Sequence, residues 1–334
     1  MKLPIKLTVT LVAFSISLAG VNQPAYSKGL DDRVSEFNVL VKTGLVSVRD
    51  FYKSQNTFER HAYLLSDIRF NPSEKIGITN KKGKPTYLIR RFEEADLNAR
   101  YTAIETLGAY AAGLASIAAH DAPERTEAAL SSIGDSVGSI GNSFASFSGK
   151  TSSSFNYASL SGPISKIAAL AGKWIVSAKK DNDLKDSIIA GEVPFSKAVS
   201  LLKRDLRNLT MSKDLAATAQ LKRLTDFYNN TYLNKQVADP EISSQRLALL
   251  REIEDAAATA AVIENTDPAE LLSEIDKTHK SLVNYAKSQN LSKKERREKS
   301  REARKEILTN LHLLVQEVKK ITEASAELKK LSQK

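Results

Sequence analysis

The sequence predicts an all-α protein, namely an elongated antiparallel bundle of long helices with a small β-hairpin between the first two helices. Apolar residues recur at alternating steps of four and three over most of the 334-residue chain, which is the period of one helix face. The alternation of strands and helices that a crossover parallel sheet requires does not occur. The breaks between periodic segments are short, which is typical of helices that pack as antiparallel neighbours.

The composition allows a large core and excludes several chemistries. Hydrophobic residues make up 42% of the chain, so wholesale disorder is not expected. The chain contains no cysteine. This excludes a disulfide framework, a thiolate zinc site, an iron–sulfur cluster and a thiol nucleophile.

The first 27 residues have the pattern of a secretory signal peptide. Lys2 and Lys6 supply a positive start, residues 7–21 are uncharged and mostly apolar, and Ala25 and Ser27 are small residues at the spacing of a cleavage site. The alternative is an uncleaved anchor helix, but a spanning helix needs about 20 apolar residues. We therefore expect cleavage after Ser27 and a periplasmic or secreted bacterial protein without a transmembrane span in its mature form, because a eukaryotic ectodomain would ordinarily carry disulfides.

Residues 28–149 form the first predicted unit. A long amphipathic helix covers about 30–69, and a second helix follows at about 88–119. The apolar seam of the first helix includes Val34, Phe37, Val41, Val48 and Phe51. Between them, short β-favouring runs around a Gly-containing turn predict a hairpin at about 71–87. Residues 129–149 are rich in Ala, Gly and Ser and give the weakest helical pattern, because glycine lowers helix stability.

Residues 150–334 form the second predicted unit, a C-terminal helical bundle that follows a Ser-rich linker. Its first helix starts at Gly162, a short helix ends at Gly191, and Pro194 opens a long helix that runs to Leu233. Three further helix starts combine a capping residue with Pro in the first turn or an acid at the third position, and they lie at Asp239-Pro240, Asp267-Pro268 and Ser292. The last helix carries an apolar seam at Ile307, Leu311, Leu314, Val318, Ile321 and Leu328.

No recognised catalytic or cofactor motif is present. The four histidines, His61, His120, His279 and His312, do not stand at metal-ligand spacing. Neither a Gly-x-Ser-x-Gly elbow nor a phosphate-binding loop occurs. The sequence therefore predicts neither a metal nor a cofactor and does not support an enzyme.

Two basic features are the candidate binding surfaces. The first is the predicted hairpin with its flanks, a projecting basic loop on a rigid scaffold, made of Lys75, Lys81, Lys82, Lys84, Tyr87, Arg90 and Arg91. The second is the start of the last helix, with Lys293, Lys294, Arg296, Arg297, Arg301 and Arg304, in a run that also contains Lys299 and Lys305. Four glutamates interrupt this second run, so a solvated helix with i,i+3 salt bridges such as Glu298–Arg301 is the alternative to a binding patch.

These observations predict a non-enzymatic interaction or scaffold protein of the bacterial cell envelope. Its partner would be an envelope protein or an anionic envelope component, and an oligomer is compatible with the sequence. Nucleic acid is not expected, because the chain is exported and aromatic residues are not interleaved with the basic ones. The alternative is a membrane-active or anionic-lipid-binding protein, because the layout of long helices and a small β-tongue is similar in shape to helical pore-forming toxins. An enzyme without a recognisable motif is the third possibility.

Overall fold

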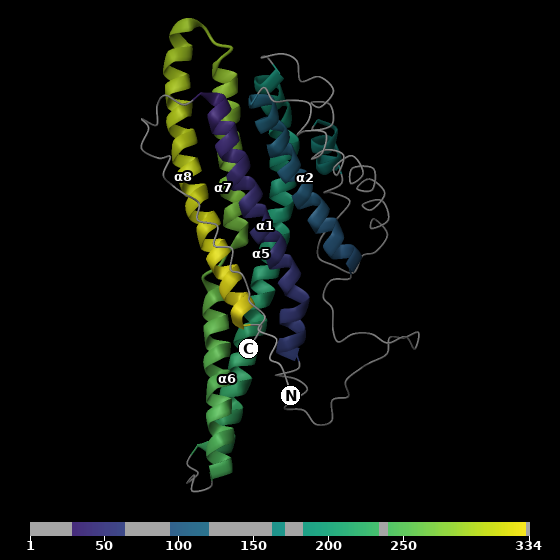
Figure 1. Cartoon of the computed structure of the whole chain (residues 1–334), viewed down its shortest axis with the longest axis vertical. Helices are drawn as coiled ribbons and strands as arrows, with labels where there is room; N and C mark the ends of the chain where they lie inside the picture. Colours follow the sequence, from purple (N-terminus) through teal and green to yellow (C-terminus); the bar gives the residue numbers. More distant parts are fainter. Residues whose placement is uncertain (1–28, 64–93, 120–161, 171–182, 234–239, 332–334) are drawn as a thin grey trace, which may run out of the picture.

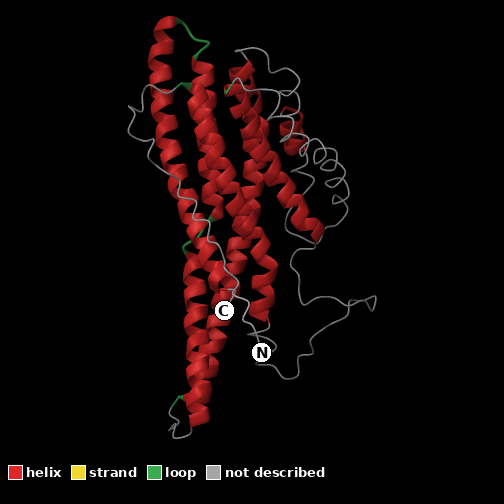
Figure 2. Cartoon of the chain, viewed as in Figure 1, coloured by secondary structure: helices red, strands yellow, loops and turns green. Residues whose placement is uncertain are grey.

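The computed structural model describes residues 29–63, 94–119, 162–170, 183–233 and 240–331, and these residues form helices joined by short turns (Figures 1 and 2). The helices are α1 (Leu30–Tyr63), α2 (Glu94–Ala118), α5 (Asp183–Tyr232), α6 (Pro240–Glu264), α7 (Pro268–Ser288) and α8 (Lys293–Leu331), with a further helical segment at 162–170. No strand occurs within the described residues, so the all-α class is confirmed. The hairpin predicted at about 71–87 lies outside them.

The bundle is elongated because its longest helices lie alongside one another. Helix α5 has 50 residues and is therefore about 75 Å long. Helices α6 and α7 follow each other along it, so that the first half of α5 packs on α7 and its second half packs on α6 (Figure 1). The hydrogen bonds from Ser196 to Asp276 and from Arg246 to Tyr228 fix these two antiparallel pairings.

Helix α1 packs in opposite senses on its two main neighbours. It is antiparallel to α2, which it meets through the Arg49–Glu105 ion pair and through Leu45 beside Gly108. It is parallel to α8, because Gly44 lies against Val318 and the hydroxyls of Ser47 and Thr322 are 3.1 Å apart. It is also parallel to α5, because Phe37 lies beside Phe195 and Tyr52 bonds Asp205. The predicted antiparallel bundle therefore contains parallel neighbours among its described helices.

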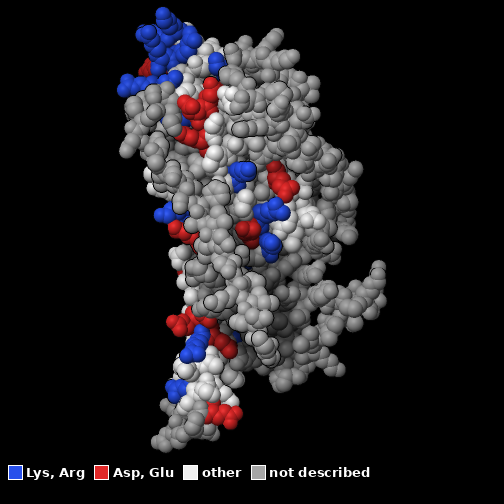
Figure 3. All heavy atoms as spheres, viewed as in Figure 1, with Lys and Arg blue, Asp and Glu red and all other residues white. Residues whose placement is uncertain are grey.

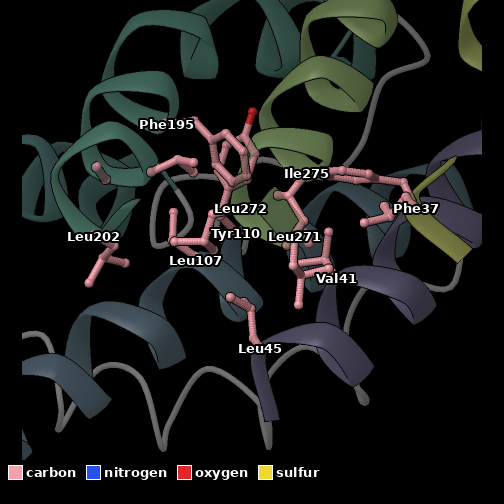
Figure 4. Close-up of a cluster of buried hydrophobic side chains, with 14 of the residues drawn as sticks. Phe37, Val41, Leu45, Leu107, Tyr110, Phe195, Leu202, Leu271, Leu272 and Ile275 are labelled. Carbon is pink, nitrogen blue, oxygen red and sulfur yellow. The ribbon is translucent and has the colours of Figure 1, made fainter. Parts of the chain in front are cut away.

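One hydrophobic core joins helices from both ends of the chain. Helices α1, α2, α5, α7 and α8 all contribute buried apolar side chains to the same cluster. The close-up shows side chains from four of these helices meeting, labelled Phe37, Val41, Leu45, Leu107, Tyr110, Phe195, Leu202, Leu271, Leu272 and Ile275 (Figure 4). Helix α7 contacts α1, α5 and α8 and is buried over most of its length, which explains its many Ala and Ser residues.

The hairpin formed by the end of α5 and by α6 has a separate, smaller cluster. Leu224, Tyr232, Leu249 and Ala256 are its buried residues. This part extends beyond the main bundle at the lower end of the view (Figure 1). None of the described helices is long and apolar enough to cross a membrane.

The prediction that a helix ends at Gly191 and another opens at Pro194 is wrong. Both residues lie inside the continuous helix α5. Proline in a helix interior costs about 3 kcal/mol because it removes one backbone hydrogen bond and crowds the preceding turn. The apolar residues that follow it, Phe195, Ala198 and Val199, are fully buried in the core, and this packing offsets the cost.

The three helix starts predicted at Asp239-Pro240, Asp267-Pro268 and Ser292 are confirmed. Helix α7 begins at Pro268, and the Asp267 carboxylate caps it by accepting a 2.9 Å hydrogen bond from the Ala269 backbone N–H. Helix α8 begins directly after Ser292, whose carbonyl accepts the first helical bond from Arg296. Helix α2 is described from Glu94, and its predicted start at about Leu88 lies outside the described residues.

Candidate anion-binding surface at the start of helix α8

The two basic surfaces predicted from the sequence differ in what the structure describes. Residues 75–91, which hold the first surface, lie outside the described residues. The second surface is fully described. We call it the basic tip, and it consists of Lys293, Lys294, Arg296, Arg297, Lys299, Arg301, Arg304 and Lys305.

A small polar cluster holds the base of the basic tip against the end of α7. Arg304 donates hydrogen bonds of 3.3 and 2.8 Å to the Tyr285 hydroxyl, and its guanidinium carbon lies 5.3 Å from the centroid of that ring. Ser300 lies within 2.9 Å of both the Ser288 hydroxyl and the Gln289 amide. These contacts fix α8 relative to α7 just below its first turns.

The tip projects past the start of α1. The contacts of Gly44 with Val318 and of Ser47 with Thr322 give a register that places Leu30 beside Arg304. The eleven residues that precede Arg304 in α8 therefore extend about 16 Å further along the rod. All eight cations of the tip are exposed, and they dominate the upper end of the surface view (Figure 3).

The predicted salt bridges within this run are not formed. Among the described residues, no carboxylate lies within ion-pair distance of a cation of the basic tip. Two of the four glutamates form hydrogen bonds with uncharged side chains. Glu295 accepts a 2.6 Å hydrogen bond from the Ser292 hydroxyl, and Glu306 accepts one from the Asn284 amide. The tip cations therefore stay available to an external anion.

The helix separates the two signs of charge, although they alternate in the sequence. At 100° per residue, the four glutamates fall within an arc of about 80°. The cations occupy the rest of the circumference. The acidic stripe consists of Glu295, Glu298, Glu302 and Glu306.

The position of these cations is unfavourable for the helix itself. The N-terminus of a helix carries a partial positive charge, so each cation in the first turn costs roughly 0.3–1 kcal/mol. Lys293, Lys294, Arg296 and Arg297 all stand there, with Glu295 as the one acid of the first turn. Residues that lower the stability of their own helix are expected at positions where the surface serves binding.

Sequence reasoning missed a buried ionic cluster between α1, α2 and α5. Arg100 and Asp205 form a two-bond ion pair of 2.6 and 2.8 Å, and the Tyr52 hydroxyl donates a 2.8 Å hydrogen bond to the same carboxylate. Nearby, the Lys213 ammonium contacts the Phe51 carbonyl at 3.2 Å and the Ser54 hydroxyl at 2.9 Å. The signal that could have found this pair is that Arg100 and Asp205 both stand on the apolar seams of their helices.

A buried tyrosine–histidine pair was also missed. The Tyr110 hydroxyl lies 2.8 Å from Nε2 of His279, and both side chains are fully buried beside Phe37 and Phe195. Burial lowers the pKa of His279 from 6.5 to about 3 and raises the pKa of Tyr110, so both groups are neutral at physiological pH. Nδ1 of His279 has no hydrogen-bond partner among the described residues.

These two clusters are built for packing. Neither is open to solvent, and within the described residues no three His, Asp or Glu side chains gather as metal ligands. His312, the other histidine with a described side chain, is exposed and contacts Gln316 on its own helix. The basic tip is therefore the part of the described structure whose chemistry is directed outward.

Comparisons of the chain with protein-family models, with curated proteins and with solved structures found no match. The function therefore has to be inferred from the chain's own residues.

Proposed function

We propose that this chain is a non-enzymatic helical interaction protein of the bacterial cell envelope, a rigid rod that holds an anionic partner at its basic tip. One observation carries the proposal: eight exposed cations gather at the end of a long bundle, and no described carboxylate forms an ion pair with them. Eight cations less the four glutamates of the same run leave this end of α8 with a net charge of +4.

The energetics support a binding role for this surface. Free cations at a helix start oppose the helix dipole, and an external anion removes that cost when it binds. Arg is well suited to this task because its planar group bonds phosphate or carboxylate through two parallel hydrogen bonds. The tip offers four exposed arginines, Arg296, Arg297, Arg301 and Arg304, of which Arg304 also bonds Tyr285.

The predicted signal peptide supports the proposed location in the bacterial cell envelope. An exported protein meets phospholipid headgroups, lipopolysaccharide phosphates and cell-wall polymers, which are anionic, so a basic surface has partners there without nucleic acid. The rod shape supports a scaffold role, because α5 alone is about 75 Å long and holds the tip at a fixed distance from the α5–α6 hairpin.

The test is sedimentation of the purified mature protein with isolated envelope fractions over a series of salt concentrations. A tip variant replaces four cations by glutamine: Lys293, Lys294, Arg296 and Arg297. A matched control removes four exposed lysines that stand on other helices: Lys42, Lys53, Lys197 and Lys222.

We expect the wild type and the control to co-sediment at low salt and the tip variant to stay in solution. If the tip variant binds the envelope fractions as well as the wild type does, the proposal that the basic tip binds the anionic partner is contradicted. Circular dichroism establishes that the variants remain helical.

A further inference from the structure

We propose that the partner of the basic tip is the surface of a bilayer rich in anionic phospholipid, on which the rod stands end-on. This inference rests on the proposed function and gives the chemical class of the partner.

The cations of the first two turns point in many directions around the helix. Those at 293, 294, 296, 297 and 299 span an arc of about 220° at 100° per residue. A protein groove contacts one stripe of a helix, so it would pair with a minority of these charges. A planar array of phosphates reached by the end of the helix meets them together.

The tip lacks the side chains that anchor protein partners. Interface energy concentrates in buried aromatic and aliphatic anchors. Within α8, the first exposed large hydrophobic side chain is Leu313, some twenty positions after the start of the helix. The exposed Val193 stands on α5, next to Glu192, which bonds Lys287 near the end of α7, and is not part of the basic tip. Tyr285, the aromatic residue at the base of the tip, is 6% exposed and already bonds Arg304. A surface of charge without an apolar anchor fits lipid headgroups better than an acidic protein.

The start of α1 lies at the same end of the rod as the basic tip. Leu30 stands beside Arg304 in the α1–α8 register, and the Gly29 N–H donates a 3.1 Å hydrogen bond to the Asp32 carboxylate at the start of α1. The predicted cleavage site after Ser27 is two residues earlier.

The same features predict peripheral binding without insertion. Each Lys or Arg near an anionic membrane contributes about 1 kcal/mol, and this attraction falls off within the Debye length. Four cations together therefore change the partitioning by about three orders of magnitude. The absence of an exposed apolar wedge among the described residues of the tip implies that the bilayer stays intact.

The first experiment measures partitioning of the mature full chain onto phosphatidylcholine vesicles with a rising fraction of phosphatidylglycerol. We expect binding to rise steeply with the anionic fraction and to disappear at about 1 M salt, where the Debye length is about 3 Å. The partition coefficient of the glutamine variant at 293, 294, 296 and 297 should fall by about three orders of magnitude, and that of the control at 42, 53, 197 and 222 should stay within about threefold of the wild type. Soluble glycerophosphate at millimolar concentration does not displace the protein.

Two results would overturn the inference. Equal losses in the tip variant and the control would show that the attraction is not located at the tip. Retained, tip-dependent binding to envelope fractions with no binding to phosphatidylglycerol vesicles would assign the tip to another anionic component, which leaves the proposed function standing.

The second experiment tests the end-on orientation with single fluorescent labels. The chain has no native cysteine, so Asn290→Cys beside the tip and Ser243→Cys near the start of α6 each give one labelled site. Vesicles with a headgroup quencher should quench the label at 290 and leave the label at 243 bright. Equal quenching would mean that the rod lies flat, and quenching at 243 alone would place the membrane at the opposite end.

Discussion

Arg100 and Asp205, which are 105 positions apart in the chain, form a doubly hydrogen-bonded ion pair inside the bundle. The Arg100 side chain is 1% exposed and that of Asp205 is 4% exposed. The guanidinium also lies 5.5 Å from the centre of the Tyr52 ring, whose hydroxyl bonds the same carboxylate. The pair ties α2 to α5 at one register, because sliding either helix by a turn would leave a buried charge without its partner.

Replacing Asp205 with asparagine should lower the free energy of unfolding by about 3–5 kcal/mol, since it removes the carboxylate charge that faces the buried guanidinium of Arg100. Urea denaturation measures the change. The control is the exposed pair Arg207–Glu270, where Arg207→Ala should cost less than about 1 kcal/mol. A loss of similar size at both sites would mean that burial does not determine the strength of the Arg100–Asp205 pair.

Two glycines in helices should respond in opposite ways to alanine. A Cβ at Gly191 would overlap the Tyr110 hydroxyl and ring, so Gly191→Ala should destabilise the protein by about 1–3 kcal/mol through overpacking. A Cβ at Gly108 would meet Leu45 at an ordinary 3.7 Å, so Gly108→Ala should stabilise it by up to about 1 kcal/mol. Thermal and urea unfolding of the two variants test the pair, and a stabilising Gly191→Ala would contradict the close approach of α2 to α5.

Acidification should weaken the fold through His279. Burial lowers the pKa of His279 in the folded protein to about 3, although Asp276 opposes this shift, so below pH 6.5 the unfolded chain binds a proton that the folded protein does not. This contribution is complete above pH 6.5 and is lost as the pH falls towards 3. Between pH 7 and pH 5 the loss is about 2 kcal/mol.

The measurement for His279 is the urea midpoint as a function of pH in the wild type and in His279→Gln, which keeps a hydrogen-bonding group near Tyr110. Between pH 7 and pH 5, the urea midpoint of the variant should fall less steeply with decreasing pH than that of the wild type, because the contribution of His279 is missing. An unchanged slope would assign the acid sensitivity to other groups.

Charge reversal at the basic tip should separate stability from binding. Lys293→Glu and Lys294→Glu place acids in the first turn of α8, where each should add about 0.3–1 kcal/mol to helix stability while envelope binding falls. Lys42→Glu, in the middle of α1, supplies the control and should change stability little. Calorimetry measures the stability of each variant, and sedimentation of the same samples measures envelope binding. A lower stability of the double variant would contradict the claim that Lys293 and Lys294 interact unfavourably with the helix dipole.

Much of the fold was predictable because the signals are local. The stepped seam of the first helix correctly marked Val34, Phe37, Val41, Val48 and Phe51 as buried. The seam of α8 did the same for Ile307, Leu311, Leu314, Val318 and Ile321. Capping residues fixed the starts of α7 and α8, because a cap acts within one turn.

The continuation of α5 through Pro194 was not predictable in this way. Proline and glycine are local stop signals, and they were outweighed by burial of the following turn against α2 and α7. The basic tip was located by the sequence, yet its unpaired state depends on where each long side chain lies in three dimensions.

The sequence by itself determined the helical class, the buried faces of the long helices and the position of the basic run, since periodicity, capping and charge are read within a few turns. The tertiary structure alone decided which helix faces which. It paired Arg100 with Asp205 and Tyr110 with His279, and it carried the start of α8 past the start of α1. Such contacts join residues far apart in the chain, and their energy depends on the packing of whole helices, which no local window contains.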